Sequence, residues 1–307
     1  TAPEEKGSGL GYALGAYLAW GIMPVYFKLL ANVGALEIVA WRIVVGAPFC
    51  LAILAYRGTL AELIDIARHR KWLLALLASS VLIGGNWLLF IHAVNDGHVL
   101  ATSLGYYLNP LITVLLGRMV LRESLSAMSK IALVLAGCGV ALLASGALDT
   151  LWISLALAIS FALYGLVRKL TPVGSVAGLA VETLMLSPIA LGALVHLSSQ
   201  PGGLAMTVGG QTTLLLLAAG IVTAIPLVFF ATAARRLSLT TLGFMQYIAP
   251  TMTFLLGLFV YGEPFSLITL GSFLFIWSGI ALVTGEAWVK RRRSQQDRAR
   301  AQAYRIQ

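Results

Sequence analysis

The sequence predicts an all-α polytopic membrane protein in which ten transmembrane helices form two five-helix repeats of inverted topology. The first observation is composition: 59% of the residues are hydrophobic and only 11% are charged, and the mean hydropathy is +0.90. A soluble domain of 307 residues could not expose such a surface to water. The second observation is that the chain matches itself when shifted by 140 residues, from near Ala16 and Ala156 to Leu142 and Leu282.

A match at one fixed interval indicates a duplicated module. The residues that coincide include Pro48 with Pro188, Phe90 with Phe230, Tyr107 with Tyr247, Pro110 with Pro250, Gly117 with Gly257, Glu123 with Glu263, and Gly139 with Gly279. Each copy holds about five apolar segments, and because this number is odd, the second copy must enter the membrane in the opposite direction. Inverted repeats of this kind are typical of transporters. The expected divisions are an N-terminal tail at 1–9, a first repeat at 10–146, a second repeat at 149–288 and a basic tail at 289–307.

Helices of about 20 apolar residues cross a hydrocarbon core of about 30 Å. The predicted spans are 10–29, 36–56, 72–92, 99–120, 127–146, 149–168, 175–196, 212–232, 240–260 and 266–288. Between spans, residues 57–71 carry apolar side chains at helical spacing, which predicts a short helix on the cytoplasmic membrane surface. The equivalent connection, 197–211, is rich in Gly and Ser and predicts an irregular external loop.

Basic residues fall on alternate connections, which predicts the orientation by the positive-inside rule. They are Arg57, Arg68, Arg70, Lys71, Arg122, Lys130, Arg168, Lys169, Arg235 and Arg236. These connections and both termini are therefore predicted to be cytoplasmic. The formal net charge of +9 comes largely from residues 290–307, which hold seven basic residues and one acidic residue. Such a juxtamembrane tail is typical of a topology determinant, so we expect no nucleic-acid partner.

Motifs for catalysis or cofactor binding are missing from the sequence. It has no glycine-rich phosphate loop with its lysine, no paired histidines at metal spacing and no serine elbow. Cys50 and Cys138 both lie inside predicted spans, which does not support a disulfide or a metal site. We therefore expect neither an enzyme nor a cofactor.

Polar and aromatic residues gather in four of the predicted spans. They are Asn86, Trp87 and Phe90 in the third span, Tyr106, Asn109 and Pro110 in the fourth, Phe230 in the eighth, and Gln246, Tyr247 and Pro250 in the ninth. Proline removes a helical hydrogen bond, and membrane depth tolerates the freed carbonyl only beside protein or a watery cavity. Prolines at equivalent positions of both repeats therefore favour a central substrate site, although simple packing kinks would leave the same pattern.

Trp20 in the first span and Tyr164 in the sixth lie too deep to be interfacial anchors. Two ionisable residues, Arg42 and Glu182, occupy equivalent positions in the second and seventh spans, where a central charge costs about 2.5–3.5 kcal/mol. Glu182 is the best candidate for a residue that titrates a proton or contacts an amine, unless it is neutral and hydrogen-bonded to a helix. Arg42 could reach outward to the interface. The repeat places the two in opposite leaflets, so it implies no direct salt bridge between them.

The fifth and tenth spans are the least polar and carry small residues at packing intervals, among them Gly139 and Gly279. Close backbone approach through such residues drives helix association in membranes. We expect these two spans to form a scaffold or a dimer contact, in a protein that works as a monomer or a homodimer.

Five segments of the chain carry a resemblance to a known family. They are AYLAWGIMPVYFKLL at 16–30, VLIGGNWLLFIHAVN at 81–95, SLGYYLNPL at 103–111, ISFALYGLVRK at 159–169 and LGFMQYIAPTMTFLL at 242–256. Together they resemble the RarD-like branch of the drug/metabolite transporter superfamily. The resemblance implies two EamA-type modules, a bacterial inner-membrane location and export of small metabolites. The superfamily also includes YddG-like exporters of aromatic amino acids. Where the family has a histidine before the arginine of the second span, this chain has Trp41.

We therefore predict an alternating-access exporter of amino acids, especially aromatic or hydrophobic ones, with a central cavity walled by spans 1, 3, 4, 6, 8 and 9. The residues predicted to bind substrate are Trp20, Asn86, Trp87, Phe90, Tyr106, Asn109, Tyr164, Glu182, Gln246 and Tyr247, and the predicted hinges are Pro110 and Pro250. The expected partners are the amino-acid substrate and the lipid bilayer. A broad multidrug or quaternary-amine exporter and a non-saturable pore remain as alternatives.

Overall fold

The computed structural model describes residues 9–95, 98–145, 148–207, 209–260 and 267–304, and within these ranges every regular element is a helix. Eight helical segments of this part are long and apolar enough to cross a membrane. They are α1 (Gly9–Lys28), α2 (Ala35–Tyr56), α4 (Arg70–Asn95), α6 (Ala127–Ala144), α7 (Leu151–Leu170), α8 (Ser175–Ser198), α9 (Gly210–Arg236), and α10 (Leu239–Gln246) taken together with α11 (Ile248–Phe259). The predicted all-helical membrane protein is thereby confirmed for the described ranges.

The two other predicted spans are also helical. They correspond to α5 (Val99–Met119) and to the first part of α12 (Leu267–Tyr304), whose apolar stretch runs over Leu270–Glu286. Neither belongs to the eight segments, so the number of ten spans stays a prediction. The observed helix ends otherwise lie within a few residues of the predicted ones, because hydropathy sets the length of a membrane helix.

The ninth span is interrupted near the predicted hinge Pro250, whereas the fourth span is continuous at Pro110, where the sequence also predicts a break. α10 ends at Gln246 and α11 begins at Ile248, with Tyr247 between them. Pro250 lies in the first turn of α11, where a missing N–H costs no helical hydrogen bond. Its counterpart Pro110 lies inside the continuous helix α5. Two prolines at equivalent repeat positions therefore have different effects on their helices.

The start of α10 is held by a carboxylate from the first half of the chain. Glu123 accepts hydrogen bonds from the backbone N–H groups of Leu239 at 2.7 Å and Thr240 at 2.9 Å. Ser238 accepts another from the N–H of Thr241 at 3.0 Å. Anionic and hydroxyl acceptors satisfy the exposed donors of a helix N-terminus. These hydrogen bonds fix the N-terminus of α10, the segment that precedes the break. The repeat counterpart Glu263 lies outside the described residues.

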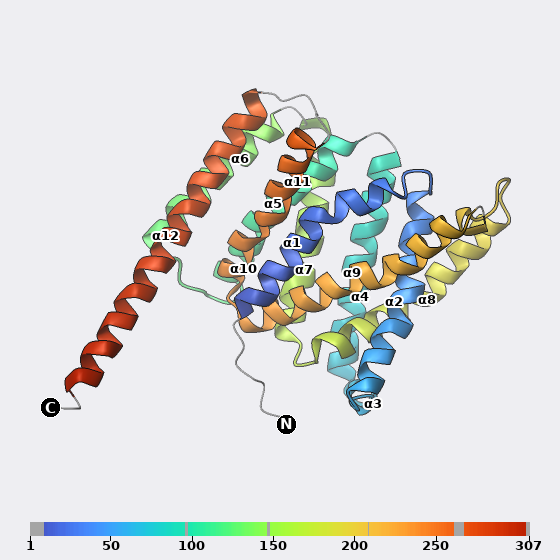
Figure 1. Ribbon diagram of the computed structural model, residues 1–307, viewed down its shortest axis with the longest axis horizontal. Helices are drawn as coiled ribbons and strands as arrows, with labels where there is room; N and C mark the ends of the chain where they lie inside the picture. Colours follow the sequence, from blue (N-terminus) through green and yellow to red (C-terminus); the bar gives the residue numbers. More distant parts are fainter. Residues whose placement is uncertain (1–8, 96–97, 146–147, 208, 261–266, 305–307) are drawn as a thin grey trace.

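The last helix continues well beyond the predicted span. α12 runs to Tyr304 and includes most of the basic tail, where the sequence predicted a separate segment from residue 289. Figure 1 shows this end of α12 projecting past the other helices. No glycine or proline follows Gly285 in the helix, and Arg, Gln, Glu and Ala are good helix formers. Residues 289–304 therefore extend the helix.

Both longer connections have the predicted character. The predicted helix within 57–71 is α3 (Ala61–Arg68), whose Ile66 is buried. Of the connection predicted at 197–211, α8 and α9 include the two ends, and the described residues between these helices are irregular apart from the short η2 (Ala205–Thr207). Glu37 in α2 holds this connection, because its carboxylate accepts hydrogen bonds from the N–H groups of Ala205 at 3.0 Å and Met206 at 3.2 Å.

The helices of the two halves interleave. α2 packs against α8 and α9, α5 packs against α7 and α10, and α1 packs against α9 and α11. α6 and α12 lie side by side at one edge of the molecule (Figure 1). There a Cβ atom on Gly139 would be 2.7 Å from the carbonyl oxygen of Ser272, and one on Gly279 would be 2.9 Å from that of Ala132. The predicted close packing of the fifth and tenth spans is confirmed by these approaches.

Two glycines at the crossing of α2 and α9 should respond differently to an added methyl group. A Cβ on Gly220 would lie 2.6 Å from Val45 Cβ, whereas one on Gly46 would meet its nearest atom at 3.7 Å. Gly220→Ala must push α2 and α9 apart, and overpacking costs about 1–3 kcal/mol. We expect Gly220→Ala to lower the unfolding midpoint in detergent and Gly46→Ala to leave it near that of the wild type. Equal midpoints for the two variants would contradict the described crossing.

Candidate substrate-binding site

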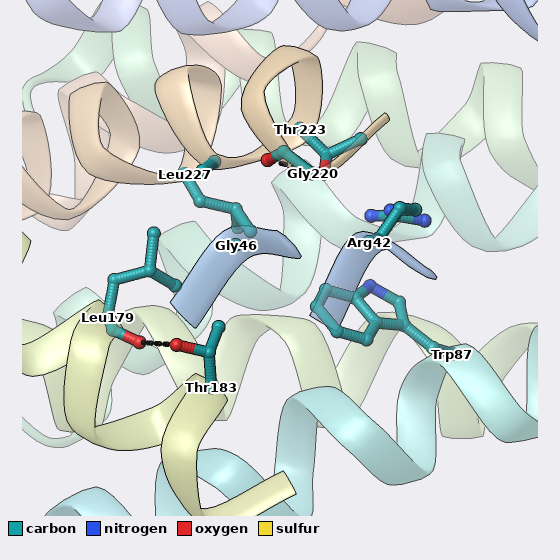
Figure 2. A pocket seen from close by; sticks show the side chains of 9 residues that line it. Arg42, Gly46, Trp87, Leu179, Thr183, Gly220, Thr223 and Leu227 are labelled. Carbon is teal, nitrogen blue, oxygen red and sulfur yellow. Dashed lines mark hydrogen bonds between the residues drawn. The ribbon is translucent and has the colours of Figure 1, made fainter. Parts of the chain in front are cut away.

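A small pocket lies where α2 and α4 of the first half meet α8 and α9 of the second (Figure 2). Its lining consists of Arg42, Gly46, Trp87, Leu179, Thr183, Gly220, Thr223, Ala224 and Leu227. The cavity volume is about 10 Å³, which is room for about one water molecule. The described conformation therefore holds this pocket nearly closed, and a molecule larger than water would enter it only after the helices separate.

The pocket walls differ from the predicted ones. Of the six spans expected to surround the cavity, only the third and the eighth, α4 and α9, line the pocket. The second and seventh spans, α2 and α8, supply the rest, because they pack directly against each other near the pocket. This approach does not depend on a glycine at position 46, since a Cβ there would lie in ordinary contact, at 3.7 Å, with the Thr183 methyl group. The hydropathy of each helix, taken separately, does not show which faces of two helices contact each other.

Arg42 is the charged residue of the pocket lining. Its guanidinium carbon lies 4.7 Å from the ring centroid of Trp87 and 5.9 Å from that of Phe27. The Nε atom is buried and has no hydrogen-bond partner. Figure 2 shows the Arg42 and Trp87 side chains close together at one end of the pocket. The cation is thus held by aromatic faces, and no acidic residue contributes to the lining.

Two threonines contribute hydroxyl groups to the lining. The Thr183 hydroxyl donates to the carbonyl of Leu179 at 2.8 Å, and the Thr223 hydroxyl donates to that of Ala219 at 2.7 Å. A hydroxyl that donates its single proton can still accept hydrogen bonds through its lone pairs. The pocket therefore combines one cation, one indole ring and two potential acceptors.

Glu182 lies behind this pocket in a buried ion pair. Its carboxylate is 3.6 Å from Arg168 Nη1, and both side chains are 1% exposed. Ser79 donates a hydrogen bond to Glu182 Oε1 at 2.5 Å, and Tyr164 donates one to Oε2 at 3.4 Å. The space for the arginine depends on Gly178, because a Cβ there would lie 1.8 Å from Arg168 Nη1. Each oxygen of Glu182 thus has a partner within the protein.

The partner of Glu182 was missed by the sequence analysis. The positive-inside pattern places Arg168 on a connection between spans, whereas the structure has it in the last turn of α7 with its side chain buried inside the helix bundle. It donates to the carbonyl of Ser175 at 3.1 Å in addition to pairing with Glu182. A usable signal was present: a lone carboxylate in a span needs a partner, and Arg168 is the nearest preceding arginine.

The predicted aromatic residues form two separate groups. Trp20 and Tyr164 both pack around Phe230, with ring centroids 5.6 Å and 6.0 Å from it. Phe90 pairs instead with Tyr106 at 6.2 Å, and Tyr106 is 56% exposed. Among these predicted aromatic residues and Trp87, only Trp87 lines the described pocket. The other rings contact the helices around it.

The predicted polar residues also differ in their surroundings. Asn86 links α4 to α7, because its amide donates to the Leu157 carbonyl at 2.8 Å and to Ser160 Oγ at 2.9 Å. Gln246 accepts from Thr113 at 3.2 Å. By contrast, Asn109 Oδ1, Gln246 Nε2 and Tyr247 OH are buried without a hydrogen-bond partner. Buried polar atoms of this kind cost free energy and are retained most readily where a ligand or water can satisfy them.

Comparison with known proteins agrees with this architecture. The EamA-like transporter family matches residues 7–145. The chain is 43% identical to Protein RarD of Salmonella typhimurium, over 92% of this chain and 97% of that protein. It is 41% identical to an uncharacterized transporter of Pseudomonas aeruginosa, over 93% of this chain and 97% of that protein. A crystal structure that is 21% identical superposes with a TM-score of 0.72 over 91% of this chain and 98% of its own, and at that identity it supports the fold alone.

The helical fold and these relatives define a multi-span membrane transporter of a bacterial type. The chain belongs to the EamA-like transporter family, within its RarD-like branch. The resemblance that the sequence motifs carried is thereby confirmed.

Breaking the Arg168–Glu182 pair should destabilise the protein. Glu182→Gln leaves the Arg168 charge buried without a counter-ion, and removing one partner of a buried pair costs about 3–5 kcal/mol. We expect a lower unfolding midpoint in detergent for this variant and recovery of most of the loss in the double variant Arg168→Met, Glu182→Gln. Arg57→Met, at an exposed arginine, is the matched control. A Glu182→Gln variant as stable as the wild type would show that the pair contributes nothing.

Proposed function

We propose that this transporter exports amino acids, chiefly aromatic or hydrophobic ones, across the bacterial inner membrane by alternating access between two inverted five-helix repeats. The observation that carries the proposal is a pocket formed jointly by the two halves, with α2 and α4 on one side and α8 and α9 on the other. Relative movement of the halves would change the exposure of such a site. Substrate sites at the interface of inverted repeats are the rule for this architecture.

The helix contacts support the inverted repeats. In the proposed correspondence, α1, α2, α4, α5 and α6 match α7, α8, α9, the α10–α11 pair and α12. Exchanging the two sets turns the contact of α4 with α7 into that of α9 with α1, and both are present. The contacts of α2 with α8, of α5 with α10, and of α6 with α12 map onto themselves. A two-fold axis in the membrane plane would produce this pattern.

The proposed orientation has both termini in the cytoplasm, as the alternate basic connections favour. The break at Tyr247 and the proline at Pro110 would let the fourth and ninth spans bend while the pocket changes sides. Asn109, Gln246 and Tyr247 are proposed as additional substrate contacts, because each keeps an unsatisfied buried polar atom.

The main alternative, a proton-driven exporter of cationic drugs, finds less support. Such a carrier needs a carboxylate that is available to the drug or to protons. Glu182 is engaged by Arg168, Ser79 and Tyr164, and the charged residue that lines the pocket is an arginine. A cationic substrate would be repelled there.

Counterflow in proteoliposomes tests the proposal. Vesicles preloaded with unlabelled phenylalanine should transiently accumulate labelled phenylalanine or tryptophan, and the initial rate should saturate with concentration. Protein-free liposomes are the control, and repeating the assay with a pH gradient shows whether protons are coupled. A rate that rises linearly without saturation would indicate a pore. Exchange of quaternary ammonium compounds but not of amino acids would favour the drug exporter.

A further inference from the structure

The charge of Arg42 has no counter-ion in the part of the chain that the structure describes. The pocket around it contains no carboxylate, and its Nε has no hydrogen-bond partner. The rings of Trp87 and Phe27 lie against the guanidinium, and the neutral side chains of Tyr26 and Tyr106 are near enough to interact with its charge. An arginine inside a membrane protein is costly and normally has an anionic partner or a functional task. Aromatic faces hold a cation but do not neutralise it.

A comparison of the two repeats shows that, of the equivalent residues Arg42 and Glu182, only Arg42 lacks a counter-ion in the described part of the chain. A shift of 140 residues places Arg42 on Glu182 and Lys28 on Arg168. In the second repeat, the residues at these positions are an arginine and a glutamate that pair at 3.6 Å. In the first repeat, both are cations and cannot neutralise each other. One repeat therefore completes its charge pair internally, whereas the other presents a cation to the pocket between the halves.

We propose that Arg42 binds the carboxylate of the transported substrate, so that the pocket selects anionic and zwitterionic molecules over amines. The inference deepens the proposed function and rests on it for the identity of the substrate as an amino acid. A guanidinium that lies over an indole ring keeps its N–H groups pointing outward in its own plane, and this fork matches a carboxylate in a bidentate arrangement. Trp87 is thus a positioning residue for Arg42.

The remaining lining suits the rest of an amino acid. The Thr183 and Thr223 hydroxyl oxygens can accept hydrogen bonds from the substrate ammonium group, because their own protons are donated to the helix backbone. Gly46 and Gly220 bring no side chain into the pocket (Figure 2), and Leu179, Ala224 and Leu227 add apolar surface. With about 10 Å³ of free volume in the described conformation, the substrate is admitted when α2 and α4 move away from α8 and α9.

A ligand series tests the wild-type protein without any substitution. The probes are L-phenylalanine, 3-phenylpropanoate, L-phenylalaninamide and phenethylamine, and the readout is the shift of the unfolding midpoint of the detergent-solubilised transporter with ligand concentration. We expect stabilisation by the first two probes, which carry a carboxylate, at concentrations at least about tenfold lower than for the two amines that lack one. Equal stabilisation by phenethylamine and L-phenylalanine would overturn the inference, as would the lack of any shift with either carboxylate.

Variants then assign the preference to Arg42. We expect Arg42→Gln to raise the half-saturating concentration of 3-phenylpropanoate by about tenfold or more, and Arg42→Lys to raise it less, because lysine keeps the charge but loses the fork. Arg57→Gln, at an exposed arginine, is the matched control. Without ligand, Arg42→Gln should keep or raise the unfolding midpoint, since it removes an uncompensated charge. Unchanged carboxylate affinity in Arg42→Gln would overturn the inference.

The proposed amino-acid export and the proposed role of Arg42 can be refuted independently of each other. Saturable counterflow of phenylalanine that Arg42→Gln leaves unchanged would refute the role of Arg42 and keep the exporter. Arg42-dependent binding of 3-phenylpropanoate without any counterflow of amino acids would keep the carboxylate site and refute amino-acid export.

Discussion

The structure depends on how this protein neutralises charge where water cannot do so. Arg168 and Glu182 form an ion pair at 3.6 Å between α7 and α8, and Ser79 on α4 donates a hydrogen bond to the same carboxylate. Three helices are thereby held in one arrangement by a single polar cluster, because separating them would leave a charge buried and unpaired. Gly178 makes room for the guanidinium. The apolar surfaces of these helices could pack in several registers, and the ion pair restricts them to one.

The two halves of the chain match in sequence at a shift of 140 residues, and their helix contacts are regular but not fully symmetric. The two halves use equivalent helices in equivalent contacts, and the self-paired contacts of α2 with α8 and α5 with α10 lie between them. Side chains at equivalent positions have nevertheless diverged: Arg42 corresponds to Glu182, and Trp87 corresponds to Leu227. All four residues lie in or directly behind the pocket. Similar helix contacts thus surround a pocket whose side chains differ between the two halves.

Much of the fold could be predicted from the sequence, and less of the site. Helix positions follow from hydropathy, and the short helix α3 follows from apolar spacing. Prolines predict a break in both the fourth and the ninth span, but only the ninth is interrupted, because a proline in a first turn and a proline inside a helix look alike in a sequence. Of the residues selected for substrate binding, Trp87 lines the pocket, while Trp20, Phe90 and Tyr164 contact other rings. The burial of Arg168 was not predicted, since a basic residue near a helix end satisfies the positive-inside rule whether it is exposed or buried.

The sequence by itself determined that this is a membrane protein and which family it belongs to, and it predicts a repeat at a shift of 140 residues. These properties depend on composition, on hydropathy summed over about 20 residues and on repeated local motifs, all of which are present in the linear chain. Only the tertiary structure decided which charges meet, which helix faces line the pocket and which buried polar atoms lack a partner. Those properties depend on the angle and rotation of packed helices, and differences of a few ångströms between side chains leave no trace in hydropathy.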